Sequence, residues 1–175
     1  MSKTIILGIT AGIAAYKSCG IIRAFVKAGH SVECILTKNA EHFITPLSLQ
    51  TLSNNQVHRS MFDKKQNFDI THISLAKKAD VILIAPASAD IIAKLACGIA
   101  DDLLTATVLA SKAKIIICPA MNSAMYEHKA TIKNMQTLIE YGYKIVEAQE
   151  GELACKDFGK GRLASIDKIV QEALL

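Results

Sequence analysis

Short, uninterrupted runs of Val, Ile and Leu recur along this chain and constrain its fold more than any other feature. Strands that are apolar on both faces are covered on both sides, which is typical of parallel sheets. We therefore predict buried strands at Thr4–Thr10, Ser31–Thr37, Asp80–Ala85, Lys114–Cys118 and Lys144–Glu147.

Longer segments with helical spacing separate these runs. The predicted helices are Ile13–Ala28 (closed by Gly29), Glu41–Leu52, Ser88–Cys97, Leu103–Ser111, Thr131–Tyr141 and Ile166–Leu174. Alternating strands and helices with right-handed crossovers form a doubly wound α/β sheet. A length of 175 residues fits one domain. We expect a single Rossmann- or flavodoxin-like domain with a mostly parallel sheet and helices on both faces.

Composition argues against several classes of protein. The net charge is +4 and the basic residues form no dense run, so we expect no nucleic-acid partner. No apolar stretch approaches the roughly 18 residues that span a bilayer, and the first residues do not resemble a signal peptide. The five cysteines lack a C-x-x-C pair and any metal-ligand spacing, which is typical of a reducing compartment. We expect a cytoplasmic protein with no metal and no membrane association.

The turn after the first strand is rich in small residues. Ligands of doubly wound sheets bind beyond the carboxyl ends of the strands. Here Thr10, Ala11, Gly12 and Ile13 lead directly into a predicted helix. Small residues let backbone N–H groups approach a phosphate, and a helix N-terminus favours an anion. A tight turn selected for packing fits the same residues equally well, so both interpretations stay open.

A similar turn follows the strand that ends near Ala85. Its residues are Pro86, Ala87, Ser88, Ala89 and Asp90. The Ser88 hydroxyl can cap the following helix, and the same helix end can hold a phosphate. On these residues alone, capping without ligand binding is the simpler interpretation.

Two further segments contain candidate catalytic groups. His72 lies where a short helix begins, a position that favours a neutral imidazole able to accept a proton. Asn122 follows the Lys114–Cys118 strand, where its amide could donate to a substrate carboxylate. Met121 and Met125 flank it and could wall a ring or simply pack. A satisfied polar histidine is the more common alternative for His72.

The segment from Gln149 to Arg162 is long, polar and rich in glycine, and we predict a substrate flap over residues 148–163. Cys155 lies in this segment beside Lys156, Lys160 and Arg162. Neighbouring positive charge lowers the pKa of a thiol, so Cys155 is the cysteine we expect to be chemically available.

The order of these motifs along the chain is more specific than any one of them. Gly-Ile-Thr-x-Gly-Ile-Ala-Ala-Tyr-Lys at 8–17 is followed by Thr-His-Ile-Ser-Leu-Ala at 71–76 and Ala-Pro-Ala-Ser-Ala at 85–89. Then come Gly-Ile-Ala-Asp-Asp-Leu-Leu at 98–104, Pro-Ala-Met-Asn at 119–122 and Glu-Gly-Glu-Leu-Ala-Cys at 150–155. Over essentially its whole length the chain resembles the homo-oligomeric flavin-containing cysteine decarboxylases, and among them the phosphopantothenoylcysteine branch.

The resemblance implies an FMN cofactor and a set of site residues. His72 matches the catalytic histidine, Asn122 the asparagine that binds the substrate carboxylate, and Cys155 the flap cysteine. Substrate contacts are implied for Met121, Met125, Ala154 and Lys156 as well as Asn122. FMN contacts are implied for Thr10, Ala11, Gly12, Ile13, Thr37, Pro86, Ala87, Ser88, Ala89, Asp90 and Asp102.

The resemblance also implies partners. Family members are trimers, or multiples of trimers, with the flavin between protomers, so His72 and Asn122 would reach one site from different chains. The chain is too short to add the synthetase domain that is often fused to this enzyme, so a separate phosphopantothenate–cysteine ligase is a possible partner. Three positions depart from the family pattern: Ala11 and Lys156 replace glycine, and Asp90 replaces asparagine.

The implied reaction converts 4'-phosphopantothenoylcysteine to 4'-phosphopantetheine in coenzyme A biosynthesis. Direct loss of CO2 from an N-acylcysteine would leave an unstabilised carbanion. Oxidation to a thioaldehyde creates an electron sink, CO2 is lost, and re-reduction of the enethiol gives the product. A lantibiotic-type peptidyl-cysteine decarboxylase and a non-catalytic flavin-binding regulatory subunit are the alternatives.

Overall fold

Parallel strands form the central sheet of the molecule. The computed structural model describes residues 1–62, 70–154 and 156–175. Within these residues the sheet has six strands in the order β3-β2-β1-β4-β5-β6, all pairing in parallel. The strands are β1 (Thr4–Ile9), β2 (Ser31–Leu36), β3 (Val57–His58), β4 (Val81–Ala87), β5 (Lys114–Pro119) and β6 (Lys144–Ile145). The predicted doubly wound α/β fold is confirmed.

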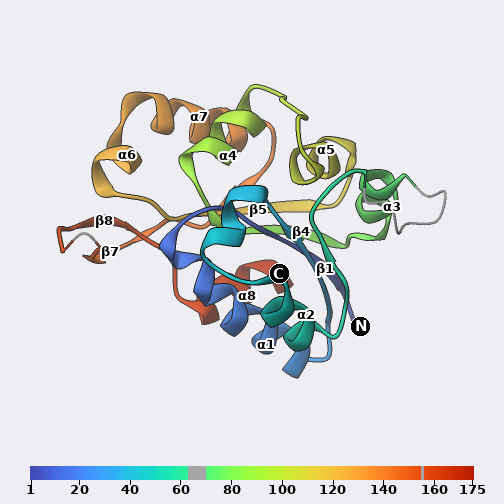
Figure 1. The fold of residues 1–175 in the computed structure, drawn as a ribbon. Coiled ribbons are helices and arrows are strands. Elements are labelled where there is room, and N and C mark those ends of the chain that lie inside the picture. The colour runs from blue at the N-terminus through green and yellow to red at the C-terminus, as the bar shows by residue number, and fades with distance from the viewer. Residues whose placement is uncertain (63–69, 155) are drawn as a thin grey trace.

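Helices cover both faces of this sheet (Figure 1). One face packs against α1 (Ser18–Lys27), α2 (Pro46–Ser53) and α8 (Ile166–Leu174). The other packs against α3 (Thr71–Lys78), α4 (Ala89–Ala96), α5 (Leu103–Ala110) and α7 (Lys129–Glu140). Successive strand residues point to opposite faces, and β1 divides accordingly: Ile5, Leu7 and Ile9 enter the first core and Ile6 the second. Because both faces of the sheet are covered, its strands appear in the sequence as continuous apolar runs.

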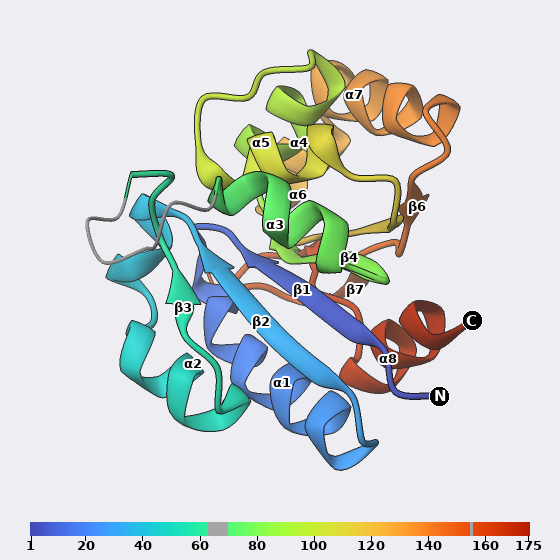
Figure 2. The ribbon, with the colours of Figure 1, turned by 90° about the vertical axis from the view of Figure 1, so that its right-hand side faces the viewer.

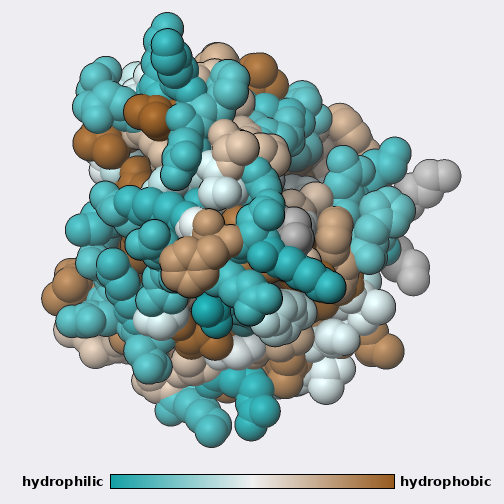
Figure 3. Space-filling model, turned by 90° about the vertical axis from the view of Figure 1, so that its left-hand side faces the viewer, coloured by the Kyte–Doolittle hydropathy of each residue, from teal (hydrophilic) through white to brown (hydrophobic). Residues whose placement is uncertain are grey.

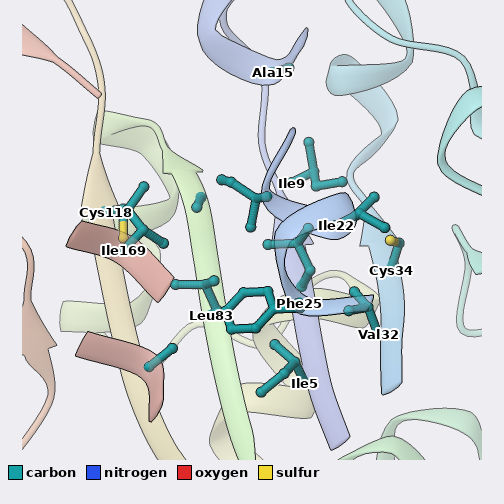
Figure 4. Close-up of a cluster of buried hydrophobic side chains, with 14 of the residues drawn as sticks. Ile5, Ile9, Ala15, Ile22, Phe25, Val32, Cys34, Leu83, Cys118 and Ile169 are labelled. Atoms are coloured by element: carbon teal, nitrogen blue, oxygen red, sulfur yellow. The ribbon is translucent and has the colours of Figure 1, made fainter. Parts of the chain in front are cut away.

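The core on the α1 side is built around Phe25. Its ring is fully buried and lies with Ile5, Ile22, Val32 and Leu83 (Figure 4). The first core extends to the far end of the chain through Ile169 of α8 and related residues. The two termini of the chain consequently lie at the same end of the molecule (Figure 2).

The boundaries of several helices differ from those predicted from the sequence. The helix predicted from Ile13 begins as a 3-10 turn, η1 (Ile13–Lys17), before α1. The continuous helix predicted over Glu41–Leu52 is wrong: the structure has a 3-10 turn, η2 (Lys38–His42), and then α2. Pro46 starts α2 because its fixed φ suits a first helical position, and Thr45 caps it. Strand β3 and the short helix α6 (Ser123–Glu127) were not predicted, since each is too short to show a period.

The predicted polar flap is a β-hairpin. Strands β7 (Gln149–Glu152) and β8 (Phe158–Arg162) pair antiparallel and form a small sheet of their own. Gly151 lies opposite Gly159 in this pairing. Glycine is depleted in strands, and this explains why the segment read as a loop. The hairpin projects from one end of the molecule (Figure 1).

A buried carboxylate ties α3 to the edge of the sheet. Glu33 of β2 is only 7% exposed, and its Oε2 lies 3.2 Å from Nε2 of His58 on β3. Its other oxygen pairs with the ammonium of Lys78 on α3. The hydrogen bond with His58 and then the contacts with Lys78 hold the pKa of Glu33 below its usual range, against the opposing effect of burial. These contacts fix the edge strand and the helix that carries His72.

The lowered pKa makes this group a source of pH-dependent stability. A carboxyl with a depressed folded pKa stabilises the fold above its unfolded pKa, about 4.3 for glutamate, and that contribution is lost as the pH falls through the folded value. Glu33→Gln should lower the free energy of unfolding at pH 7 and flatten its decline between pH 5 and 3, as measured by urea titration at each pH. Glu41→Gln is the matched control, because its pair with Arg59 is exposed and 3.6 Å long. Parallel pH curves for Glu33→Gln and wild type would contradict this role.

Candidate functional site

A cavity of about 680 Å³ opens at the carboxyl ends of the central strands. Its walls come from the turn after β1, the turn after β4, the segment after β5 and the β7–β8 hairpin. Nine of the residues predicted from sequence to bind a ligand or act in catalysis line it: Ala11, Gly12, Ile13, Ser88, Ala89, Met121, Asn122, Met125 and Ala154. Segments that are distant in sequence thus line one cavity. It lies at the carboxyl ends of the strands, where open α/β sheets bind ligands.

Thr10 joins the two turns that form the inner wall. Its hydroxyl donates to the Pro86 carbonyl at 2.8 Å and accepts from the Ser88 N–H at 2.9 Å. The side chain is 2% exposed, and Thr10 is not among the cavity-lining residues of the described chain. Its hydroxyl therefore links the two turns. The cofactor contact that the family resemblance implies for Thr10 stays a prediction.

Ala11 and Gly12 leave room at this wall. A Cβ added to Gly12 would meet no heavy atom of the described residues within 4 Å, so the missing side chain faces open space. Ala11 avoids positive φ, so its methyl group is accommodated without the backbone strain that a glycine would relieve. The backbone of this turn is therefore accessible to a ligand.

Ser88 caps α4 beside this open space. Its hydroxyl accepts from the Ile91 N–H at 3.3 Å, and the residue lines the cavity. Asp90, in the first turn of the helix, points to solvent with a side chain 74% exposed and lies 3.6 Å from Lys94. The α4 terminus therefore faces the cavity, and Asp90 is not among the described residues of the wall.

Other predicted cofactor residues lie off the cavity wall. Asp102 caps α5, accepting from the backbone and hydroxyl of Thr105 at 2.8 Å each. Thr37 begins η2, and its N–H donates to the Ile9 carbonyl at 3.1 Å. Pro86 and Ala87 are buried in β4. None of these four residues is among the described residues that line the cavity.

The segment after β5 presents an amide to the cavity. Asn122 caps α6, and its Oδ1 accepts from the Ala124 N–H at 2.9 Å, which fixes the orientation of the side chain. Met121 and Met125 line the cavity on either side of it, and Met125 is 49% exposed. A polar amide between two thioethers suits a ligand with one carboxylate and an otherwise apolar body.

Glycines dock the hairpin onto this segment. The Met121 N–H donates to the Gly161 carbonyl at 3.0 Å. A Cβ on Gly161 would overlap the Met121 carbonyl oxygen, and one on Gly159 would lie 2.9 Å from Cβ of Ser123. Glycine at both positions is what allows β8 to approach so closely. The hairpin is therefore a wall held in place by backbone contacts.

The described part of the hairpin turn has an unusual backbone. Lys156 adopts φ +69°, a left-handed conformation that glycine adopts without strain, and this accords with glycine being common there in the resembling family. Its side chain is exposed and is not among the cavity-lining residues described. Cys155, the predicted flap cysteine, lies outside the described residues.

Two basic residues of the cavity were missed in the sequence-based list of site residues. Lys17 ends η1 and Arg162 ends β8, and both line the cavity. Burial, and then the neighbouring Arg162 charge, lower the pKa of Lys17. Both residues lie at the ends of segments that the sequence analysis had singled out. No signal in the sequence, however, indicated that Lys17 and Arg162 line the same cavity.

His72 is remote from this cavity. It is the second residue of α3, as predicted, but it is absent from the described lining. Figure 1 places α3 and the β7–β8 hairpin at opposite ends of the molecule, and in Figure 2 α3 is in front while β7 lies behind the sheet. One chain therefore does not bring His72 and Asn122 together.

Two other features, a cluster of metal ligands and a membrane-spanning helix, were searched for among the described residues. Across 1–62, 70–154 and 156–175, no three His, Cys, Asp or Glu side chains gather as metal ligands would. No helix within those ranges has the length and apolar character to cross a membrane.

Thr10→Val tests the two hydrogen bonds with which Thr10 joins the turn after β1 to the turn after β4. Because the Ser88 N–H and the Pro86 carbonyl would lose a buried partner, the free energy of unfolding should fall by about 1–3 kcal/mol. Thr10→Ser keeps the hydroxyl and should cost less than about 1 kcal/mol, the value of one buried methyl group. Urea unfolding of both variants measures the difference. Equal losses would mean that the methyl group, not the hydroxyl, carries the stabilisation.

Comparison with known proteins identifies relatives along the whole chain. It is 44% identical over 172 residues to the coenzyme A biosynthesis bifunctional protein CoaBC of Bacillus subtilis, covering 98% of this chain and 42% of that protein. For the CoaBC protein of Vibrio cholerae the identity is 47% over 161 residues, covering 92% and 40%. The chain therefore spans about two fifths of the length of these bifunctional relatives.

Solved structures with the same fold include two decarboxylases. A PPC decarboxylase variant complexed with pantothenoylaminoethenethiol matches with a TM-score of 0.87 and 28% identity, covering 98% of this chain and 96% of that one. The FMN-dependent cysteine decarboxylase SpaF matches with a TM-score of 0.85 and 28% identity, covering 99% and 95%. The model of the Flavoprotein family matches residues 1–174. This chain belongs to the Flavoprotein family.

Proposed function

We propose that this protein uses FMN to decarboxylate 4'-phosphopantothenoylcysteine to 4'-phosphopantetheine in coenzyme A biosynthesis. The observation that carries the proposal is one cavity that joins an open small-residue turn, the Asn122 amide and the hairpin. The CoaBC relatives are named for coenzyme A biosynthesis, and a similar structure holds pantothenoylaminoethenethiol. Both lines of support point to the same substrate class.

The inner wall fits a flavin mononucleotide. Gly12 faces open space, Ser88 and Ala89 begin α4 at the cavity, and Ile13 adds an apolar side chain for a ring. A helix N-terminus with free backbone N–H groups favours a phosphate. We assign FMN binding to these residues and Ala11, with Thr10, Thr37, Pro86, Ala87, Asp90 and Asp102 as further candidates from the family resemblance. When bound, FMN accepts and returns an electron pair, which supplies the sink that CO2 loss from an N-acylcysteine requires.

Asn122 is the proposed carboxylate-binding residue. Its capping bond to Ala124 fixes the side chain before substrate arrives, which limits the entropy lost on binding. Met121 and Met125 would pack against the body of the substrate, and Ala154 and Lys156 would contact it from the hairpin turn. Orienting the carboxylate is the task of this wall.

His72 is the proposed acid–base residue, supplied by a second copy of the chain. Support comes from the separation of α3 and the hairpin in one chain (Figure 1). Further support comes from apolar side chains left uncovered at the cavity: Ile13 is 61% and Tyr16 60% exposed. A neighbouring copy would cover them and add its α3. A homotrimer, or a multiple of trimers, closes such head-to-tail contacts into a ring.

The hairpin is the proposed flap that excludes water over residues 148–163. Cys155, between β7 and β8 in the sequence, is the proposed proton donor for the final reduction. The face at this end of the molecule is mostly hydrophilic with separate apolar patches (Figure 3). We further propose a cytoplasmic enzyme whose partner is a phosphopantothenate–cysteine ligase, on the same longer chain or on another.

A product assay tests the function and the role of Cys155 together. Wild type incubated with phosphopantothenoylcysteine should release one CO2 per 4'-phosphopantetheine formed, with no external reductant. Cys155→Ser should still release CO2 but should yield the enethiol, which is lighter by two hydrogen atoms, because the reduction lacks its proton donor. Mass spectrometry of the product and CO2 trapping measure both.

Each arm of this assay can fail separately. Yellow wild-type protein that leaves phosphopantothenoylcysteine unchanged would reject the proposed function. Turnover of a peptide ending in cysteine instead would favour the peptidyl-cysteine alternative. Normal 4'-phosphopantetheine from Cys155→Ser would reject the role of that thiol alone.

Complementation tests the shared site. His72→Asn and Asn122→Asp should each be inactive and remain yellow. Co-expressed from one cell with different tags and purified through both tags, mixed trimers should regain about one third of wild-type activity, because a ring of three chains of mixed type has one interface in three with both residues intact. Co-expression of two differently tagged His72→Asn chains is the control and should stay inactive. An inactive mixed oligomer would contradict a site built from two chains.

A further inference from the structure

Lys17 and Arg162 are two cations that share the cavity and have no ion-pair partner among the described residues. Neither makes an ion pair within 4.0 Å, or a side-chain hydrogen bond, with any residue in the described ranges. Lys17 is half-buried, and both its burial and the Arg162 charge disfavour its protonated form. Two like charges brought together in a hollow raise the free energy of the empty protein. An anion bound between them would relieve that cost.

Other basic side chains near the site are neutralised. Lys160, on the same strand as Arg162, lies 2.8 Å from Glu147, and this pair raises the pKa of the lysine. Lys94 on α4 lies 3.0 Å from Asp101. The only acidic side chain in the described cavity wall is Glu152, which pairs with neither Lys17 nor Arg162. The cavity thus keeps an excess of positive charge at this one place.

The two cations come from two different walls of the cavity. Nη1 of Arg162 lies 3.4 Å from where a Cβ on Gly151 would be, so the Arg162 side chain lies beside β7 at Gly151. Gly161, next to Arg162, carries the carbonyl that receives the Met121 N–H. Lys17 ends the turn whose first residues form the open inner wall. The pair therefore comes from the end of the inner-wall turn and from the hairpin, and both residues line the same cavity.

We propose that Lys17 and Arg162 together bind the terminal phosphate of the substrate, and so select phosphorylated over dephosphorylated N-acylcysteines. This inference rests on the proposed function. A phosphate monoester carries nearly two negative charges at neutral pH, which matches one ammonium and one guanidinium. Arg supplies paired donors in a fixed plane, and Lys supplies a point charge from the opposite wall. The carboxylate held by Asn122 and the phosphate held by the cations would fix both ends of the substrate.

Steady-state kinetics on two substrates test the pair. For Lys17→Gln and for Arg162→Gln in the flavin-loaded enzyme, kcat/KM for phosphopantothenoylcysteine should fall about 10- to 100-fold, the range of one charge-assisted hydrogen bond. The fall should be in KM. With dephosphorylated pantothenoylcysteine, the same variants should change less than about threefold, since that substrate offers no phosphate. Lys27→Gln, on the exposed side of α1, removes the same charge outside the cavity and should change neither value.

Binding without turnover separates this inference from the proposed reaction. Calorimetry should give tighter binding of 4'-phosphopantetheine than of pantetheine to wild type, and a difference at least tenfold smaller for Lys17→Gln. Equal kinetic losses on both substrates, or an unchanged binding preference, would overturn the inference. If wild type binds 4'-phosphopantetheine through these residues but turns over neither substrate, the proposed reaction fails and the phosphate site stands.

The flavin carries a phosphate too, so retention of FMN is the third measurement. Lys17→Gln and Arg162→Gln should retain the wild-type ratio of FMN to protein after gel filtration. Loss of FMN by either variant, with the substrate preference unchanged, would assign the cations to the cofactor and reject the substrate site. Unfolding in urea should show both variants at least as stable as wild type, because each removes one of two repelling charges.

Discussion

The contact on which the site depends is made by one buried hydroxyl. Strands β1 and β4 are neighbours in register, and Thr10 continues that neighbourhood past their ends by bonding both the Pro86 carbonyl and the Ser88 N–H. Two turns that are far apart in sequence are thereby held edge to edge. The space beside Gly12 is a cavity only because the turn after β4 forms its other wall.

A second constraint is the lack of side chains at Gly159 and Gly161, where β8 meets the segment after β5. Hairpins of two strands are marginal on their own, and this one gains its position from contact with the segment after β5. Gly161 and Gly159 permit backbone contact with Met121 and close packing on Ser123. The same approach brings Arg162 to the cavity opposite Lys17. The contacts that dock the hairpin therefore also place Arg162 in the same cavity as Lys17.

The site also has a boundary that one chain does not close. Apolar side chains such as Ile13 and Met125 remain exposed at its mouth, and α3 with His72 lies at the other end of the molecule (Figure 1). The contacts of Glu33 with His58 and Lys78 hold that helix against the sheet edge. A helix fixed this rigidly suits presentation of a side chain to a neighbouring copy, as the proposed oligomer requires.

The sequence by itself determined the layers: apolar runs such as Lys114–Cys118 gave strands, and periodic segments such as Ile166–Leu174 gave a helix with those bounds. It also located most of the cavity wall, because small residues and caps such as Gly12 and Ser88 are local signals of a turn that opens a helix. Only the tertiary structure decided that Thr10 supports the wall from behind, that the glycine-rich flap is a hairpin, and that Lys17 meets Arg162. Those facts depend on contacts between residues far apart in the chain, and periodicity along the chain carries no record of such contacts.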